Sequence, residues 1–96
     1  MQQYLIYAHD GTDEQALSRR MNARPAHFEG AKALKAQGNF ILGGALLNAD
    51  GQMIGSTMVL QFETAAEFQH WYDHEPYIQQ GVWQKIEVHP FRVANL

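Results

Sequence analysis

The sequence predicts an α+β domain in which a four-stranded antiparallel sheet carries helices on one face. Three observations predict this class. Short runs rich in β-branched and aromatic residues alternate with stretches of helical periodicity, in the order β-α-β-β-α-β. An Asp50-Gly51 turn joins the two middle strands as a hairpin. This order is the split βαβ arrangement, in which the helices leave the opposite face of the sheet open.

Length and composition fit a single folded domain over residues 1–96. The chain is 46% hydrophobic and 18% charged, which favours a packed core over disorder. A chain this short often hides part of its apolar surface in an oligomer. Apolar residues occur at both parities of the predicted strands, so we expect the open sheet face to be covered in a homodimer.

Several classes of protein are disfavoured or excluded. The net charge of −3 and the lack of a strong basic cluster disfavour a nucleic-acid partner. The absence of cysteine excludes disulfides, thiolate zinc sites and a cysteine nucleophile. The first residues lack the basic and apolar regions of a secretory signal, and no apolar run approaches the ~20 residues of a membrane span. We therefore expect a cytoplasmic protein with no membrane partner.

The first strand and the first helical stretch occupy the N-terminal part of the chain. Tyr4–Ala8 is short and rich in aromatic and β-branched residues, which favours a strand. Thr12 or Asp13 is a candidate helix N-cap, and acidic residues suit the first turn. Gly38 is a good residue to end the helical stretch.

Pro25 interrupts this helical pattern. A proline inside a helix loses one hydrogen bond and clashes with the preceding turn, at a cost of ~3 kcal/mol. Two alternatives follow. Either one helix ends near Asn22 and a second begins with Pro25 in its first turn, or one long helix kinks there. We expect a break or a kink rather than an uninterrupted helix.

The second half of the chain predicts a hairpin, a second helix and a final strand. Thr64 and Glu67 form the capping box that begins a helix, and Pro76 ends it because proline disfavours a helical residue before it. The expected elements are strands over 39–48 and 54–63, a helix over 65–73, one further turn over 77–80 and a strand over 82–93.

Arg24 and His27 lie three residues apart and therefore share a face of the predicted helix. An imidazole with an ordinary pKa of ~6.5 suits proton transfer near neutrality, so His27 is a candidate general base or acid. A guanidinium can hold a carboxylate through two hydrogen bonds, so Arg24 is a candidate substrate ligand. The alternatives are a structural or surface histidine, and an arginine that pairs with Glu29 or Asp73.

Three further residues are candidates to complete a site. Glu75, held at a helix end by Pro76, is placed to orient and charge-stabilise an imidazole, although it could also be an exposed loop acid. Ser56 is a candidate hydrogen-bond donor on a strand, without the Gly-x-Ser-x-Gly elbow of hydrolases. Tyr77 is a candidate wall for a flat ligand ring, or a core or interface residue.

No metal or cofactor is predicted. The five histidines are scattered, and although His70 and His74 have the i, i+4 spacing, no His-Glu-x-x-His motif exists. The glycines at 43–44 and 55 match neither the dinucleotide-binding nor the P-loop pattern, because neither precedes a helix. They are expected to serve strand geometry or a close approach of backbone or ligand.

Together these motifs resemble the YciI-like (YCII-related) family over nearly the whole chain. The motifs that carry the resemblance are Arg24-x-x-His27, Gly43-Gly44, Gly55-Ser56-Thr57, Glu75-Pro76-Tyr77 and Val88-x-Pro90-Phe91. The resemblance implies a ferredoxin-like fold of the dimeric α+β barrel type, usually found as a dimer. It also implies a site built on a histidine and an acid, with His27, Arg24 and Ser56 at family positions. The family usually has aspartate where this chain has Glu75, so Asp73 is an alternative acid.

Two functions fit these residues. The first is a cofactor-independent lyase or isomerase acting on a small aromatic or lactone-like acid. His27 would move the proton, Glu75 would orient His27, and Arg24, Ser56 and Tyr77 would contact the substrate. The second is a non-catalytic module for small-ligand binding or dimerisation, since a fold does not decide a function. A closed pocket beside His27 favours the enzyme, and a shallow cleft favours the module.

Overall fold

A computed structural model describes all residues from 1 to 96. Its elements are β1 (Gln2–Asp10), α1 (Ala16–Ala36), β2 (Phe40–Leu47), β3 (Met53–Phe62), α2 (Ala65–His74), α3 (Pro76–Gln79) and β4 (Trp83–Phe91). The predicted β-α-β-β-α-β order is confirmed, and the short helix α3 is the further turn expected before the last strand.

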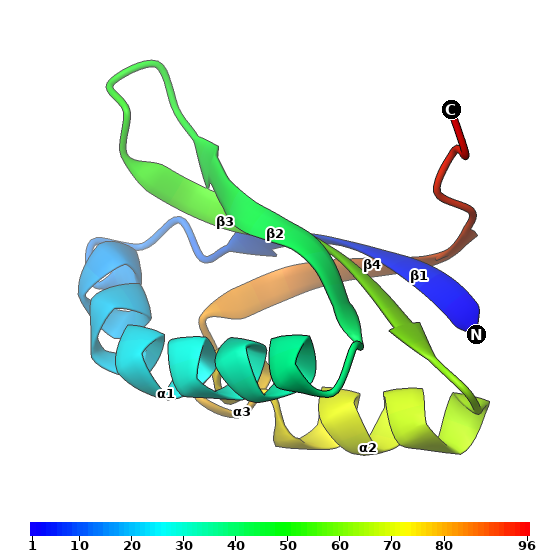
Figure 1. Ribbon diagram of the computed structural model, residues 1–96. Coiled ribbons are helices and arrows are strands. Elements are labelled where there is room, and N and C mark those ends of the chain that lie inside the picture. Colours follow the sequence, from blue (N-terminus) through cyan, green and yellow to red (C-terminus); the bar gives the residue numbers. More distant parts are fainter.

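The four strands form one antiparallel sheet in the order β2-β3-β1-β4. Ile6 on the central strand β1 lies opposite Met58 on β3 and opposite Val88 on β4. All three helices lie on the same side of this sheet (Figure 1). The predicted α+β fold class is therefore confirmed.

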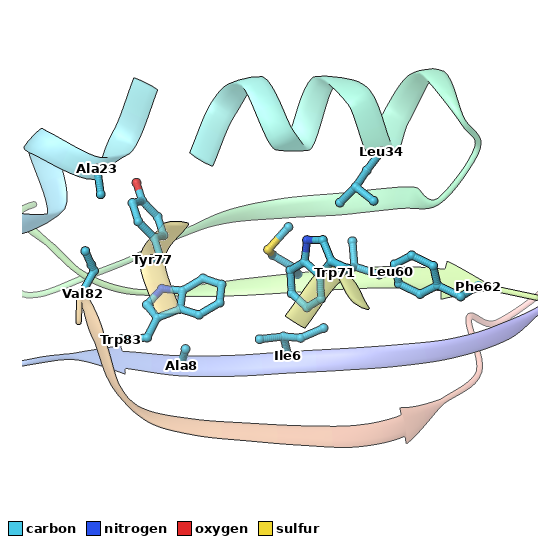
Figure 2. Close-up of a cluster of buried hydrophobic side chains, with 11 residues drawn as sticks. Ile6, Ala8, Ala23, Leu34, Leu60, Phe62, Trp71, Tyr77, Val82 and Trp83 are labelled. Carbon is cyan, nitrogen blue, oxygen red and sulfur yellow. The ribbon is translucent and has the colours of Figure 1, made fainter. Parts of the chain in front are cut away.

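The core fills the space between the sheet and the helices (Figure 2). Ser56, Met58, Leu60 and Phe62 are all buried, as expected for alternate residues of a strand that face one layer. The other buried hydrophobic residues of this cluster are Ile6, Ala8, Ala23, Leu34, Trp71, Tyr77, Val82 and Trp83. Full burial of a large apolar side chain stabilises a fold by roughly 1.5–3 kcal/mol, so this layer holds the helices on the sheet.

Helix α1 runs unbroken from Ala16 to Ala36 with Pro25 inside it, so the expected break near Asn22 is wrong. Ala23 and Leu34 on either side of the proline are buried against the rest of the fold. Most helical stability in proteins comes from such packing, and here it offsets the local cost of the proline. The helix also begins later than predicted, because Asp13 accepts the backbone N–H of Gln15 before the first turn.

Gly55 marks a close approach between β3 and β1. A Cβ atom at this position would lie 2.3 Å from the carbonyl oxygen of Ala8, which no real side chain tolerates. The glycine therefore allows the two strands to pair in the register that sets Ser56 opposite Ala8. This register brings Ser56 close to Asp10, the last residue of β1.

None of the helices combines the length and the apolar character needed to cross a lipid bilayer.

Candidate functional site

The structure brings His27 and Glu75 together. His27 lies on the buried side of α1, and its Nδ1 is hydrogen-bonded to Oε1 of Glu75. The exposed fractions are 10% for the imidazole and 2% for the carboxylate side chain. A carboxylate oxygen can only accept, so the bond requires a proton on Nδ1, and in the neutral imidazole the lone pair then lies on Nε2.

Local backbone geometry explains the position of Glu75. The residue is at once the C-cap of α2 and the N-cap of α3, in an extended conformation that the following Pro76 favours. Its Oε1 also accepts the backbone N–H of Tyr77 at 3.1 Å. Asp73, the alternative acid, is exposed and accepts a hydrogen bond from Gln69 at 2.8 Å, so it takes no part in this pair.

Tyr77 supports the imidazole of His27 by stacking against one face of it. Its ring stacks on His27 with 3.9 Å between ring centroids and 11° between planes, and the residue is fully buried. Trp83 packs edge-on against Tyr77, and the Tyr77 hydroxyl points toward α1 near Ala23 (Figure 2). Burial raises the pKa of Tyr77 above its ordinary value of 10.0. Tyr77 is thus placed to hold His27, and it does not line the cavity where substrate contact was expected.

A second buried network joins α1 to the sheet. Ser56 Oγ accepts one hydrogen bond from Arg20 Nη2 at 2.9 Å and another from Trp83 Nε1 at 3.1 Å. Arg20 Nη1 donates to both carboxylate oxygens of Asp10, at 3.0 and 3.1 Å. Burial raises the pKa of Asp10 above 3.8, although the neighbouring Arg20 acts to lower it.

Asp10 and Arg20 are the site residues that sequence reasoning missed. Arg20 precedes Arg24 by four residues and therefore shares its helix face, which was the one available signal. Asp10 ends the first strand, ten residues before Arg20, and no spacing rule connects a strand end with a helix interior. Their pairing depends on how α1 lies across the sheet.

A cavity of about 320 Å³ lies between α1 and the β2–β3 hairpin. Its walls combine cationic, polar and apolar groups: Arg20, Arg24, His27, Phe28, Ala31, Lys32, Lys35, Phe40, Gly43, Gly44, Ala45, Met53, Ser56 and Met58. No acidic side chain is among them. The cavity therefore complements an anion that carries an apolar body.

Arg24, like Lys35, is a cation of this cavity that forms no ion pair. No carboxylate pairs with it, because Glu29 pairs with Lys32 and Asp73 with Gln69. Its guanidinium lies 4.5 Å from the centre of the Phe28 ring, a cation–π contact that fixes its position without neutralising its charge. Arg24, His27 and Ser56, three of the predicted site residues, thus share one cavity.

Comparison with protein families gives a match over residues 2–92 to the YCII-related domain. The chain belongs to the YCII-related family. It is 33% identical over 95 residues to protein YciI of Escherichia coli O6:H1 and to that of Shigella flexneri, covering 93% of this chain and 95% of each relative. An uncharacterized protein of Haemophilus influenzae is 28% identical over 95 residues, with the same coverage.

Solved structures of similar shape support the same fold. The 5-chloro-2-hydroxyhydroquinone dehydrochlorinase TftG of Burkholderia phenoliruptrix AC1100, in complex with 2,5-dihydroxybenzoquinone, is 25% identical with a TM-score of 0.81. The alignment covers 96% of this chain and 95% of TftG. A dimeric ferredoxin-like protein of unknown function from Jannaschia sp. CCS1 is 17% identical with a TM-score of 0.60, covering 97% of this chain and all of its own. The ferredoxin-like fold is confirmed.

Proposed function

We propose that this protein is a cofactor-independent enzyme of the lyase or isomerase type that moves a proton on a small anionic substrate. The observation that carries the proposal is the His27–Glu75 pair beside a cavity with cationic walls. A histidine held by a carboxylate is a recurring arrangement for general acid–base catalysis. It needs no further group to take up and return a proton.

His27 acts as the base through its free Nε2. When Nε2 takes a proton from a substrate carbon, the imidazole becomes a cation, and the Glu75 carboxylate stabilises that cation. The negative charge left on the substrate spreads to an oxygen, which Arg24 and Ser56 are placed to receive. An isomerase returns the proton to a different atom, whereas a lyase completes the reaction by losing a leaving group.

The similarity to TftG supports this class of reaction. By its name, TftG is a dehydrochlorinase. Loss of hydrogen chloride from a molecule includes the removal of a proton, which is the step that a general base assists. For the present chain we propose a small aromatic or lactone-like acid, because the cavity offers apolar walls from Phe28, Phe40 and Met58 beside its cations.

We also propose that the protein is a homodimer joined through the open sheet face, the side of the sheet away from the helices. By strand register Leu5, Tyr7, Leu42 and Val59 lie on this face. Tyr7 is 37% exposed and Leu42 is 52% exposed. Apolar groups gathered in this way on one face usually mark an interface.

The test of the enzyme proposal is proton exchange. Small carboxylates and phenolic acids are incubated with the protein in D₂O, and loss of substrate C–H signals is followed by NMR. His27→Gln keeps a donor for Glu75 but removes the base. We expect it to bind the same anions while exchange slows about 10²- to 10⁴-fold, the usual contribution of a general base.

Anion binding without catalysis would contradict the enzyme proposal. If the wild-type protein binds anions in the cavity but catalyses exchange or elimination on none of them, the enzyme proposal is wrong. The protein would then be the non-catalytic ligand-binding module.

A further inference from the structure

The Ser56 hydroxyl has only one hydrogen-bonding role left to it. Its Oγ accepts from Arg20 Nη2 and from Trp83 Nε1. A guanidinium and an indole can only donate, so both lone pairs of Oγ are occupied. What remains is the O–H of Ser56 itself, which can only donate.

No atom of the protein accepts this proton. Every hydrogen bond of the Ser56 side chain has the oxygen as acceptor, although the residue is only 2% exposed. A buried donor without a partner destabilises the folded state, because it has lost its hydrogen bonds to water and gained none in exchange. Ser56 is also part of the cavity wall, so the acceptor that satisfies it must come from an occupant of the cavity.

Arg20 is held in the orientation in which it donates a hydrogen bond to Ser56 Oγ. Its Nη1 is held by both oxygens of Asp10, and its guanidinium lies 4.8 Å from the centre of the Tyr77 ring. Arg20 is 3% exposed and Asp10 is 7% exposed. Turning Arg20 toward a ligand would leave the Asp10 carboxylate buried without its partner, which is strongly unfavourable. Arg20 therefore stays paired with Asp10 where it lines the cavity, and it fixes the Ser56 hydroxyl beside it.

We propose that Asp10, Arg20 and Trp83 are positioning residues that make Ser56 an obligate hydrogen-bond donor toward the ligand. The inference rests on the proposed function and narrows its substrate class. The atom that meets Ser56 is an oxygen with a free lone pair: a carboxylate, enolate or quinone oxygen. A donor-only group such as an ammonium finds no partner in Ser56 or Arg24, because both only donate, and has only the Nε2 lone pair of His27 to bind.

The proposed hydrogen bond from Ser56 to a ligand can be tested with 2,5-dihydroxybenzoquinone. This compound is a ring that bears several acceptor oxygens. Ser56→Ala should weaken binding about 10- to 100-fold, as expected for a lost hydrogen bond to a charged group. Thr57→Ala is the matched control, because it removes a neighbouring hydroxyl that faces the other side of the sheet. Equal affinities of the wild-type protein and Ser56→Ala would overturn the proposal.

The positioning role is tested by replacing the ion pair as a unit, with Arg20→Gln and Asp10→Asn together. A glutamine carbonyl can accept the Ser56 proton and turn the hydroxyl away from the cavity. We expect a loss of affinity similar to that of Ser56→Ala, and less than about a 3-fold further loss when Ser56→Ala is added. A double variant that binds the quinone like the wild type, or losses that simply add, would contradict the role.

Exchange of the Trp83 indole Nε1–H with water gives a second measurement that needs no ligand. This proton should exchange at least 10-fold faster in Ser56→Ala, and should stay protected in the Arg20→Gln/Asp10→Asn variant, where Ser56 still accepts it. Unchanged exchange in Ser56→Ala would overturn the proposal. If the wild-type protein bound no anion but Trp83 behaved as expected, the proposed function would fail while the orientation of Ser56 would stand.

Discussion

At the scale of single residues, the site contains two buried acids, and each of them holds a different basic side chain. Glu75 receives the imidazole of His27 and the backbone N–H of Tyr77, so it sets the orientation of the base. Asp10 neutralises Arg20, which in turn fixes Ser56. Neither acid lines the cavity, so under the proposed function each would affect a ligand only through another side chain.

The pH dependence of stability should report the burial of Asp10. Burial raises its pKa, so the folded state binds a proton more tightly than the unfolded state does. The stabilisation from Asp10 protonation is therefore complete below the unfolded value of 3.8 and is lost as pH rises through the folded value. The free energy of unfolding of the wild-type protein minus that of Asp10→Asn should therefore fall as pH rises from about 3 to 7.

Urea denaturation at several pH values in this range measures that difference. Asp13→Asn, which alters an exposed acid three residues away, is the control and should show no comparable trend. If the difference for Asp10→Asn instead grew with rising pH, the carboxyl group would have a lowered pKa, and burial would not dominate its environment.

At the scale of elements, helix α1 is the scaffold of the site. Arg20, Arg24 and His27 occupy one face of it at spacings of four and three residues, so they follow one another along the cavity. This face could be predicted from the sequence because helical spacing depends only on position in the chain. Of the two alternatives predicted at Pro25, the break near Asn22 is wrong, because the local cost of a proline was weighed without the packing that offsets it.

Contacts between elements were less accessible to sequence reasoning. Alternation along β3 groups Ser56 with Met58 on one face of the strand, but it does not reveal the neighbours Arg20 and Trp83, which depend on strand register and on the position of α1. The His27–Glu75 contact followed from the family resemblance together with the helix end at Pro76. Tyr77 was predicted to contact the substrate because an aromatic ring suits the wall of a ligand pocket. The sequence does not show on which side of the imidazole this ring lies.

At the scale of the whole molecule, the helices cover one side of the sheet and leave Tyr7 and Leu42 exposed on the other. If this open face forms a homodimer, Leu42→Lys should place a charge in the interface and convert the dimer to a monomer. Leu17→Lys, at an exposed position on α1, should leave the dimer intact. Sedimentation velocity distinguishes these species, and a monomeric wild-type protein would contradict the proposed interface.

The central claim is that Glu75 holds His27 with a proton on Nδ1 and a free lone pair on Nε2. The most direct measurement is a ¹⁵N-edited NMR spectrum of the His27 ring above the pH at which free imidazoles are charged. We expect the Nδ1–H tautomer in the wild-type protein and loss of that preference in Glu75→Ala. An Nε2–H tautomer, or a ring unaffected by Glu75→Ala, would contradict this expectation, because Nε2 of His27 would then have no lone pair to act as a base.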